Sequence, residues 1–165
     1  PVSQADMTEA GRAVSCIWML IGGCAGSTAG GMKTVTVAVL LLSTWSVARG
    51  KSSLTVFRRR ISPGQIAMAY AIVTMMVGWA IAGAVVLAAG NGIPFLNALF
   101  ETTSALGTVG LTADVTAGLS AASQIMIIIF MFFGRVGIMT ISMGFMMSDR
   151  AEERIRFAET KLMIG

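Results

Sequence analysis

The fold is decided by a segment between two long apolar runs, Phe100-Glu-Thr-Thr-Ser-Ala-Leu-Gly-Thr-Val-Gly-Leu-Thr112. A helix over 95–106 would rise about 18 Å, roughly half the thickness of a bilayer. The residues 107–111 that follow contain too much glycine to continue this helix. Extended polar backbone is tolerated at membrane depth only where it is buried in protein or lines a watery path. The segment therefore predicts a re-entrant pore loop.

The residues after the half-length helix predict a filter for a cation. The filter residues are Thr108, Val109, Gly110 and Leu111, and the carbonyls of the first three are expected to replace the water around K⁺. Gly110 can adopt a positive φ that turns neighbouring carbonyls to a common axis, whereas Val109 is expected to pack away from the pore. We expect Glu101 to hold the pore helix through hydrogen bonds, the alternative being a field that attracts cations. A plain surface turn is the competing interpretation of the whole motif.

Composition and charge indicate a membrane protein. Hydrophobic residues make up 55% of the chain and charged residues only 12%, about half the charge of a soluble domain. Basic residues cluster in 49–60 and in 150–161 and are absent from 90–118. The positive-inside rule then places 50–63 and the C-terminus in the cytoplasm, so that the pore loop enters from outside. Each basic cluster contains a single aromatic residue, Phe57 or Phe157, so we expect the clusters to set the topology and not to bind nucleic acid. The chain has no histidine, the commonest general base and metal ligand.

The apolar segments predict an all-α membrane protein. The run 65–89 has 25 residues, enough to cross a bilayer, and Pro63 suits its first turn. The run 7–49 is interrupted by glycines at 22–33. It fits either two full spans or one broken span, and the second is favoured because 8–21 is too short to cross alone. A last span over 119–147 is expected to begin at the N-cap Ser120.

An internal repeat relates the apolar segment near the start of the chain to the last apolar span. Residues 19–22, Met-Leu-Ile-Gly, align with 131–134, Met-Phe-Phe-Gly, at an offset of 112. The same offset places Thr8 on Ser120, and both are expected to cap an apolar helix that runs to a glycine. A filter strand equivalent to the one at Gly110 would then lie just upstream of Pro1.

The glycine-rich segment 22–33 is a candidate gate, because its backbone lacks helical partners at membrane depth. Its candidate residues are Gly22, Gly23, Gly26, Ser27, Thr28, Gly30, Gly31 and Lys33. A mobile loop across the ion path and a close-packed seam of GxxxG glycines explain the segment equally well. A nucleotide-binding P-loop is disfavoured because Met32 adds a residue before the lysine and the segment follows a helix. Ser27 likewise lacks the glycine and the histidine that a nucleophile elbow needs, so we expect no enzyme.

Arg135 is a third candidate, because an arginine inside a span is costly and is usually functional or paired. The repeat places it at the depth of Gly23, where its donors suit several carbonyls of the glycine-rich segment. The alternative partner is a carboxylate on a segment outside this chain.

Together these motifs resemble the Trk/Ktr/HKT superfamily of potassium transporters, most closely its KtrB-type membrane subunits. The resemblance rests on Phe100-Glu101, on Ser104-Ala-Leu-Gly-Thr-Val-Gly-Leu111, on 22–34 and on Met131-Phe-Phe-Gly-Arg-Val-Gly137. It implies four M1–P–M2 repeats around one pore. Residues 1–49 would be the second helix of the third repeat, 50–63 a linker, 64–147 the fourth repeat and 148–165 a tail. Within the fourth repeat it implies M1 at 64–89, a pore helix at 95–106, the filter at 107–111 and M2 at 119–147.

The resemblance also implies the partners and the setting. It predicts K⁺ uptake in the plasma membrane, a gate loop at 22–33, and Arg135 beneath that gate. It implies the remaining pore repeats, a homodimer, and a cytoplasmic RCK nucleotide-binding regulatory subunit. K⁺ would be the transported ion and Na⁺ a candidate activator, with no resident cofactor. A non-conducting membrane scaffold packed through glycine seams is the alternative function.

Overall fold

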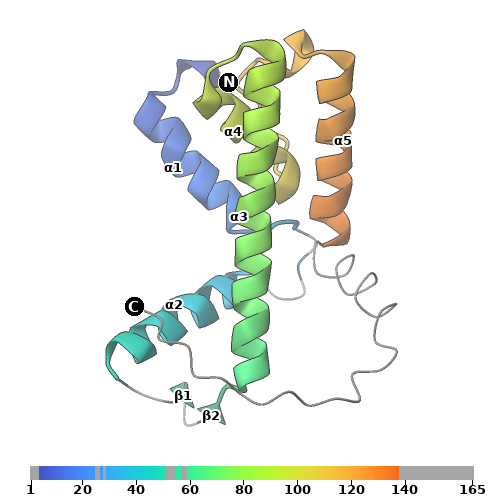
Figure 1. Cartoon of the computed structure of the whole chain (residues 1–165). Coiled ribbons are helices and arrows are strands. Elements are labelled where there is room, and N and C mark those ends of the chain that lie inside the picture. The colour runs from blue at the N-terminus through green and yellow to red at the C-terminus, as the bar shows by residue number, and fades with distance from the viewer. Residues whose placement is uncertain (1–3, 25–26, 28, 51–54, 57–58, 138–165) are drawn as a thin grey trace, which may run out of the picture.

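The computed structural model describes residues 4–24, 27, 29–50, 55–56 and 59–137, and the chain there is mainly helical (Figure 1). The α-helices are α1 (Glu9–Leu20), α2 (Thr34–Ala48), α3 (Pro63–Asn91), α4 (Phe95–Gly107) and α5 (Ala121–Val136). Short 3₁₀ turns cover Gln4–Asp6 and Thr116–Gly118. Strands β1 (Thr55–Val56) and β2 (Arg59–Arg60) pair antiparallel, with Thr55 opposite Arg60.

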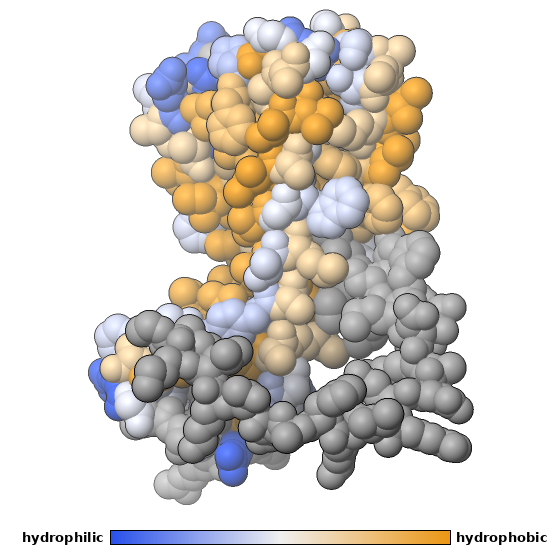
Figure 2. Space-filling view, viewed as in Figure 1, coloured by the Kyte–Doolittle hydropathy of each residue, from blue (hydrophilic) through white to orange (hydrophobic). Residues whose placement is uncertain are grey.

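Helix α3 is the long axis around which the other helices gather (Figure 1). It begins with Pro63 in its first turn after the cap Ser62, and it ends where Gly92 adopts a left-handed φ of 64°. With 29 residues it is the one helix among the described residues that is long and apolar enough to cross a membrane. Apolar residues cover much of the visible face around it (Figure 2). Such a surface suits lipid or further membrane helices.

Helix α4 forms the core of the fold, with α1, α3 and α5 packed against it. Every residue from Phe100 to Gly107 is buried, although the stretch includes threonine, serine and glutamate. The buried hydroxyls are hydrogen-bonded: Thr102 Oγ1 donates to Ala80 O at 3.1 Å and Thr103 Oγ1 to Leu99 O at 2.8 Å. These bonds offset the cost of burying polar side chains in an apolar surround.

The apolar run 7–49 is divided into α1 and α2, which are separated by 21–33. With 12 and 15 residues, neither helix reaches the length of a full span, which fits one broken span better than two full spans. The two helices also have different neighbours. Helix α1 packs on α4, whereas α2 packs on α3, where Ser43 Oγ donates to Tyr70 Oη at 3.1 Å.

Helices α1 and α5 begin 112 residues apart, at Glu9 and Ala121. The predicted caps are confirmed, because Thr8 accepts from Gly11 N and Ser120 from Ser123 N. Helix α5 nevertheless ends earlier than the span predicted for 119–147. Gly137 leaves the helical region at a φ of 90°, so Arg135 lies in the last helical turn. Residues 138–147 of the predicted span and the tail 148–165 lie outside the described residues.

Candidate ion pathway

The candidate filter begins at the C-terminal cap of α4, where the chain leaves the helix in a left-handed turn. Thr108 N donates to Ala105 O at 3.1 Å and Val109 N to Ser104 O at 2.9 Å. Thr108 itself has φ 54° and ψ 38°. Glycine normally occupies such a cap, because a β-branched residue there is strained by about 1–3 kcal/mol. The structure therefore holds Thr108 in a costly conformation at the start of the filter.

The rest of the filter segment is open on one side. Gly110 has a φ of 82°, and no heavy atom lies within 4 Å of the position that a Cβ would take. Val109 is 43% exposed and lines a cavity, whereas the sequence predicts that it packs away from the pore. Leu111 is anchored through its carbonyl, which accepts a hydrogen bond from Ser104 Oγ at 2.5 Å. The segment is thus fixed to α4 at both ends.

Glu101 makes hydrogen bonds that hold the pore helix α4, and their partners lie in the chain beyond the filter. Its side chain is only 4% exposed. One carboxylate oxygen accepts from Thr112 Oγ1 at 2.6 Å and from Ala113 N at 2.9 Å. The other accepts from Thr116 Oγ1 at 2.6 Å. Three charge-assisted hydrogen bonds thus tie 112–116 to the middle of α4.

Two glycines allow α1 and α5 to approach the end of α4 on opposite sides. A Cβ on Gly107 would collide with Met19 O of α1. A Cβ on Gly134 of α5 would collide with Leu106 O. The packing role of these two glycines cannot be read from the sequence, because glycine at a helix end looks locally like a cap. The two helices that the repeat relates therefore flank the start of the filter.

Backbone hydrogen bonds join the two ends of the segment 21–33, so that it forms a loop. Gly22 N donates to Met32 O at 2.7 Å, Met32 N to Leu20 O at 3.0 Å, and Thr34 N to Gly23 O at 3.2 Å. These bonds satisfy backbone groups that would be costly at membrane depth. The described part of this segment is not helical. A GxxxG seam needs glycines on one helix face, and Gly26, which both glycine pairs share, lies outside the described residues.

The Lys33 side chain bridges two backbone carbonyls of the same loop. Its ammonium donates to Ser27 O at 3.0 Å and to Ala29 O at 2.8 Å. Gly31 turns the chain there with a φ of 75°. Of the other predicted gate residues, Gly26 and Thr28 lie outside the described residues. The lysine thus supplies donors to carbonyls that have no helical partner.

One cavity of about 480 Å³ lies between the filter segment and the loop. Residues of both line it, and the lining includes Gly22, Gly23, Ala29, Thr108, Val109 and Leu111. Two segments nearly eighty residues apart in sequence therefore share one space. Arg135 is exposed, and its neighbour Gly134 presents its carbonyl to Gly30: a Cβ on Gly30 would lie 3.0 Å from Gly134 O. The loop, the filter and the end of α5 thus meet at one place.

Two asparagines tie neighbouring helices together at the helix ends away from the filter. Asn91 Nδ2 donates to Ser123 Oγ at 2.8 Å, and Ser120 N donates to Asn91 Oδ1 at 2.8 Å. The end of α3 is thereby tied to the start of α5. Arg12 of α1 donates to Asn97 Oδ1 of α4. No local sequence pattern marks these contacts, since each joins separate helices.

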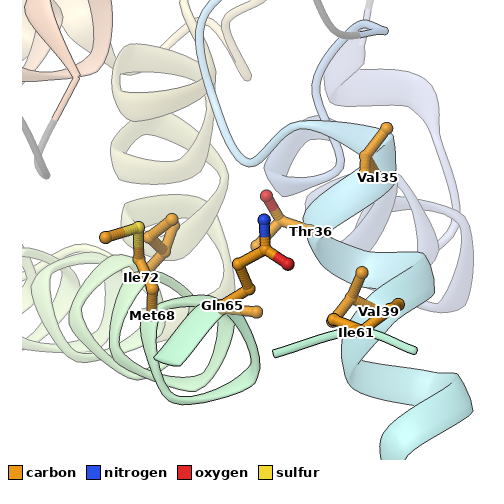
Figure 3. A pocket seen from close by; sticks show the side chains of 8 residues that line it. Val35, Thr36, Val39, Ile61, Gln65, Met68 and Ile72 are labelled. Carbon is orange, nitrogen blue, oxygen red and sulfur yellow. The ribbon is translucent and has the colours of Figure 1, made fainter. Parts of the chain in front are cut away.

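A second cavity, of about 330 Å³, lies between α2 and the first turns of α3, away from the filter. Its walls are mostly apolar, and Gln65 extends from α3 into it toward α2 (Figure 3). Among the residues that the structure describes, no charged side chain lines it. It therefore shows no polar cluster suited to binding a bare ion.

The chain matches known proteins over nearly its whole length. The family model described as TrkH, cation transport protein, matches residues 2–154. The potassium/sodium uptake protein NtpJ of Enterococcus hirae is 34% identical over 165 residues, covering 97% of this chain and 37% of that protein. The Ktr system potassium uptake protein B of Bacillus subtilis is 35% identical over 160 residues, covering 97% and 36%. The chain thus spans just over a third of the length of these relatives.

Proposed function

The chain belongs to the TrkH family of cation transport proteins, and we propose that it forms part of a K⁺ uptake pathway. The family confirms the resemblance to Trk/Ktr transporters and the expectation of a membrane transport protein and not an enzyme. In the proposal, 107–111 supplies one strand of a carbonyl-lined filter. Loop 22–33 is the gate below it. The other strands come from pore repeats that complete the transporter.

The observation that carries the proposal is the shared cavity between the filter segment and the loop. A buried half-length helix points its C-terminal end at this cavity, and the negative end of its dipole favours a cation there. The positive φ of Gly110 is one that other residues adopt only with strain. A loop held beside the filter can narrow or widen the path by a small displacement.

The filter assignment is tested with Gly110→Ser in the transporter completed by its remaining repeats. A serine at φ 82° is strained by about 1–3 kcal/mol, which lowers the population of this filter conformation by about fivefold to 150-fold, and we expect the K⁺ over Na⁺ discrimination to fall. Gly118→Ser is the matched control, because Gly118 has open space at its Cβ position. Competition between Rb⁺ and Na⁺ uptake measures the discrimination. Unchanged discrimination in Gly110→Ser would remove the filter assignment.

The gate assignment is tested by deleting Ala25–Gly30. A gate predicts higher K⁺ flux at equal amounts of protein in the membrane, whereas a packing seam predicts that the protein is lost. An unchanged flux with normal amounts of protein would contradict both interpretations.

The proposal extends to ions, partners and topology. The relative from Enterococcus hirae is named for uptake of potassium and sodium, and we assign K⁺ as the transported ion here with Na⁺ as a second candidate. The proposed partners are a second copy of the transporter and a cytoplasmic RCK nucleotide-binding subunit. The proposed location is the plasma membrane, with 50–63 and the C-terminus in the cytoplasm.

A further inference from the structure

A single side-chain hydrogen bond joins the loop to the filter among the described residues. Gly30 N donates to Thr108 Oγ1 at 2.9 Å, across 78 positions of sequence. Gly30 is buried, so its N–H would be costly to leave without an acceptor. The threonine hydroxyl is therefore the partner that allows this part of the loop to sit against α4.

Gly30 lies in close contact with two other segments, at Thr108 and at Gly134. A Cβ on Gly30 would collide with Thr108 Oγ1 and would lie 2.7 Å from Thr108 Cγ2 and 3.0 Å from Gly134 O. Only glycine brings its backbone this close to both α4 and α5. The loop backbone at Gly30 is therefore in direct contact with the first filter residue, Thr108.

The backbone of Thr108 gives an independent reason to look at this residue. A β-branched side chain at φ 54° is strained, and glycine or asparagine would relieve that strain. Strain of this kind persists where neighbouring contacts hold it, and it gathers at functional sites. Holding the Gly30 amide is a role that glycine could not perform, because it has no hydroxyl.

We propose that the Thr108 hydroxyl is a latch that holds the loop 22–33 in its seat against the filter, an inference that rests on the proposed gate function of the loop. When the loop is seated, the Gly30 amide is paired with Thr108. When the loop moves away, the amide can pair with water in the pathway. Removing the acceptor therefore destabilises the seated loop alone and moves the equilibrium toward the displaced, conducting form.

The test is Thr108→Val in the transporter completed by its remaining repeats. Valine keeps the shape and the β-branch but cannot accept the hydrogen bond. The loss of this acceptor in a buried site is expected to raise the maximal rate of K⁺ uptake about fivefold or more. Thr108→Ser keeps the acceptor and should give a smaller increase.

Thr74→Val is the matched control, because Thr74 is exposed on α3, away from loop and filter. The same pair of substitutions is then made in the transporter that lacks Ala25–Gly30. If Thr108 acts through the loop, Thr108→Val raises uptake in the intact protein and has no further effect after the deletion. Such non-additivity is the signature of two groups acting together.

Three results would overturn the latch. The first is unchanged uptake in Thr108→Val while the deletion still raises it, which would leave the gate standing without a latch. The second is an equal effect of Thr108→Val in both backgrounds, which would place its action in the filter. The third is a change in ion preference with an unchanged maximal rate. If neither variant nor deletion alters uptake, the gate function itself fails.

If Thr108→Val is not produced in the membrane, Gly30→Ala tests the same contact from the other side. Its Cβ would collide with Thr108 Oγ1, so the loop cannot take its seat. The latch predicts the same rise in maximal rate, and normal or reduced uptake in this variant would overturn it.

Discussion

Replacement of Glu101 by alanine should release the chain that follows the filter. The carboxylate receives three hydrogen bonds, from Thr112 Oγ1, Ala113 N and Thr116 Oγ1. After truncation the two threonine hydroxyls, which lie 2.9 Å apart, can pair with each other. The buried Ala113 amide keeps no partner, and we expect a total loss of about 3 kcal/mol in the stability of this segment.

Glutamine at position 101 is the discriminating second variant. Its amide oxygen can still accept from Ala113 N and Thr112 Oγ1, and its amide nitrogen can donate to Thr116 Oγ1. Neutral hydrogen bonds are about half as strong as charge-assisted ones, so the loss should be only about 1 kcal/mol. Alanine should therefore lower the stability of this segment much more than glutamine does.

The assay is Rb⁺ uptake with Na⁺ as competitor, normalised to the amount of transporter in the membrane. A loss of about 3 kcal/mol lowers the population of the correctly held segment by up to about a hundredfold, and uptake and ion preference should fall together. If Glu101→Ala shows the same uptake and ion preference as the unsubstituted transporter, the bracing role is refuted. Equal damage from glutamine and alanine would instead support the alternative, in which the negative charge of Glu101 attracts cations.

Three further substitutions test separate parts of the pathway. Gly107→Ala should lower the free energy of unfolding in detergent by about 1–3 kcal/mol, because its Cβ would collide with Met19 O. Gly118→Ala is the control and should leave this free energy unchanged. Equal stability of the two variants would show that α1 need not approach α4 so closely. Lys33→Met leaves the carbonyls of Ser27 and Ala29 without their donor, and K⁺ flux should rise severalfold as the loop loosens; an unaltered flux would place the closure elsewhere. Arg135→Ala should raise K⁺ flux by removing a positive charge from the path, whereas a lower flux at normal protein levels would count against a barrier role.

Local signals in the sequence account for much of the fold. The glycine after Leu106 and the shortness of the run predict where the half-length helix stops. The hydroxyl residues Thr8 and Ser120 mark the starts of two helices, because their side chains accept from the free amides of the first turn. Both signals act within one turn of helix, which is why they can be read from a single sequence.

Contacts between distant segments could not be predicted in the same way. The pairing of Gly30 with Thr108 and the partners of Glu101 depend on how separate elements are brought together, and no residue spacing encodes them. The left-handed conformation of Thr108 is likewise imposed by tertiary structure against the preference of a β-branched residue. Such conflicts between local preference and global fold are expected at functional sites.

The central claim is that the carbonyls of Thr108, Val109 and Gly110 contact the transported cation. The most direct test is the anomalous scattering of Rb⁺ or Tl⁺ in crystals of the transporter completed by its remaining repeats. The account predicts peaks in contact with these carbonyl oxygens, beside the cavity shared with loop 22–33. Ordered ions found only elsewhere, with these carbonyls turned away from the pathway, would contradict it.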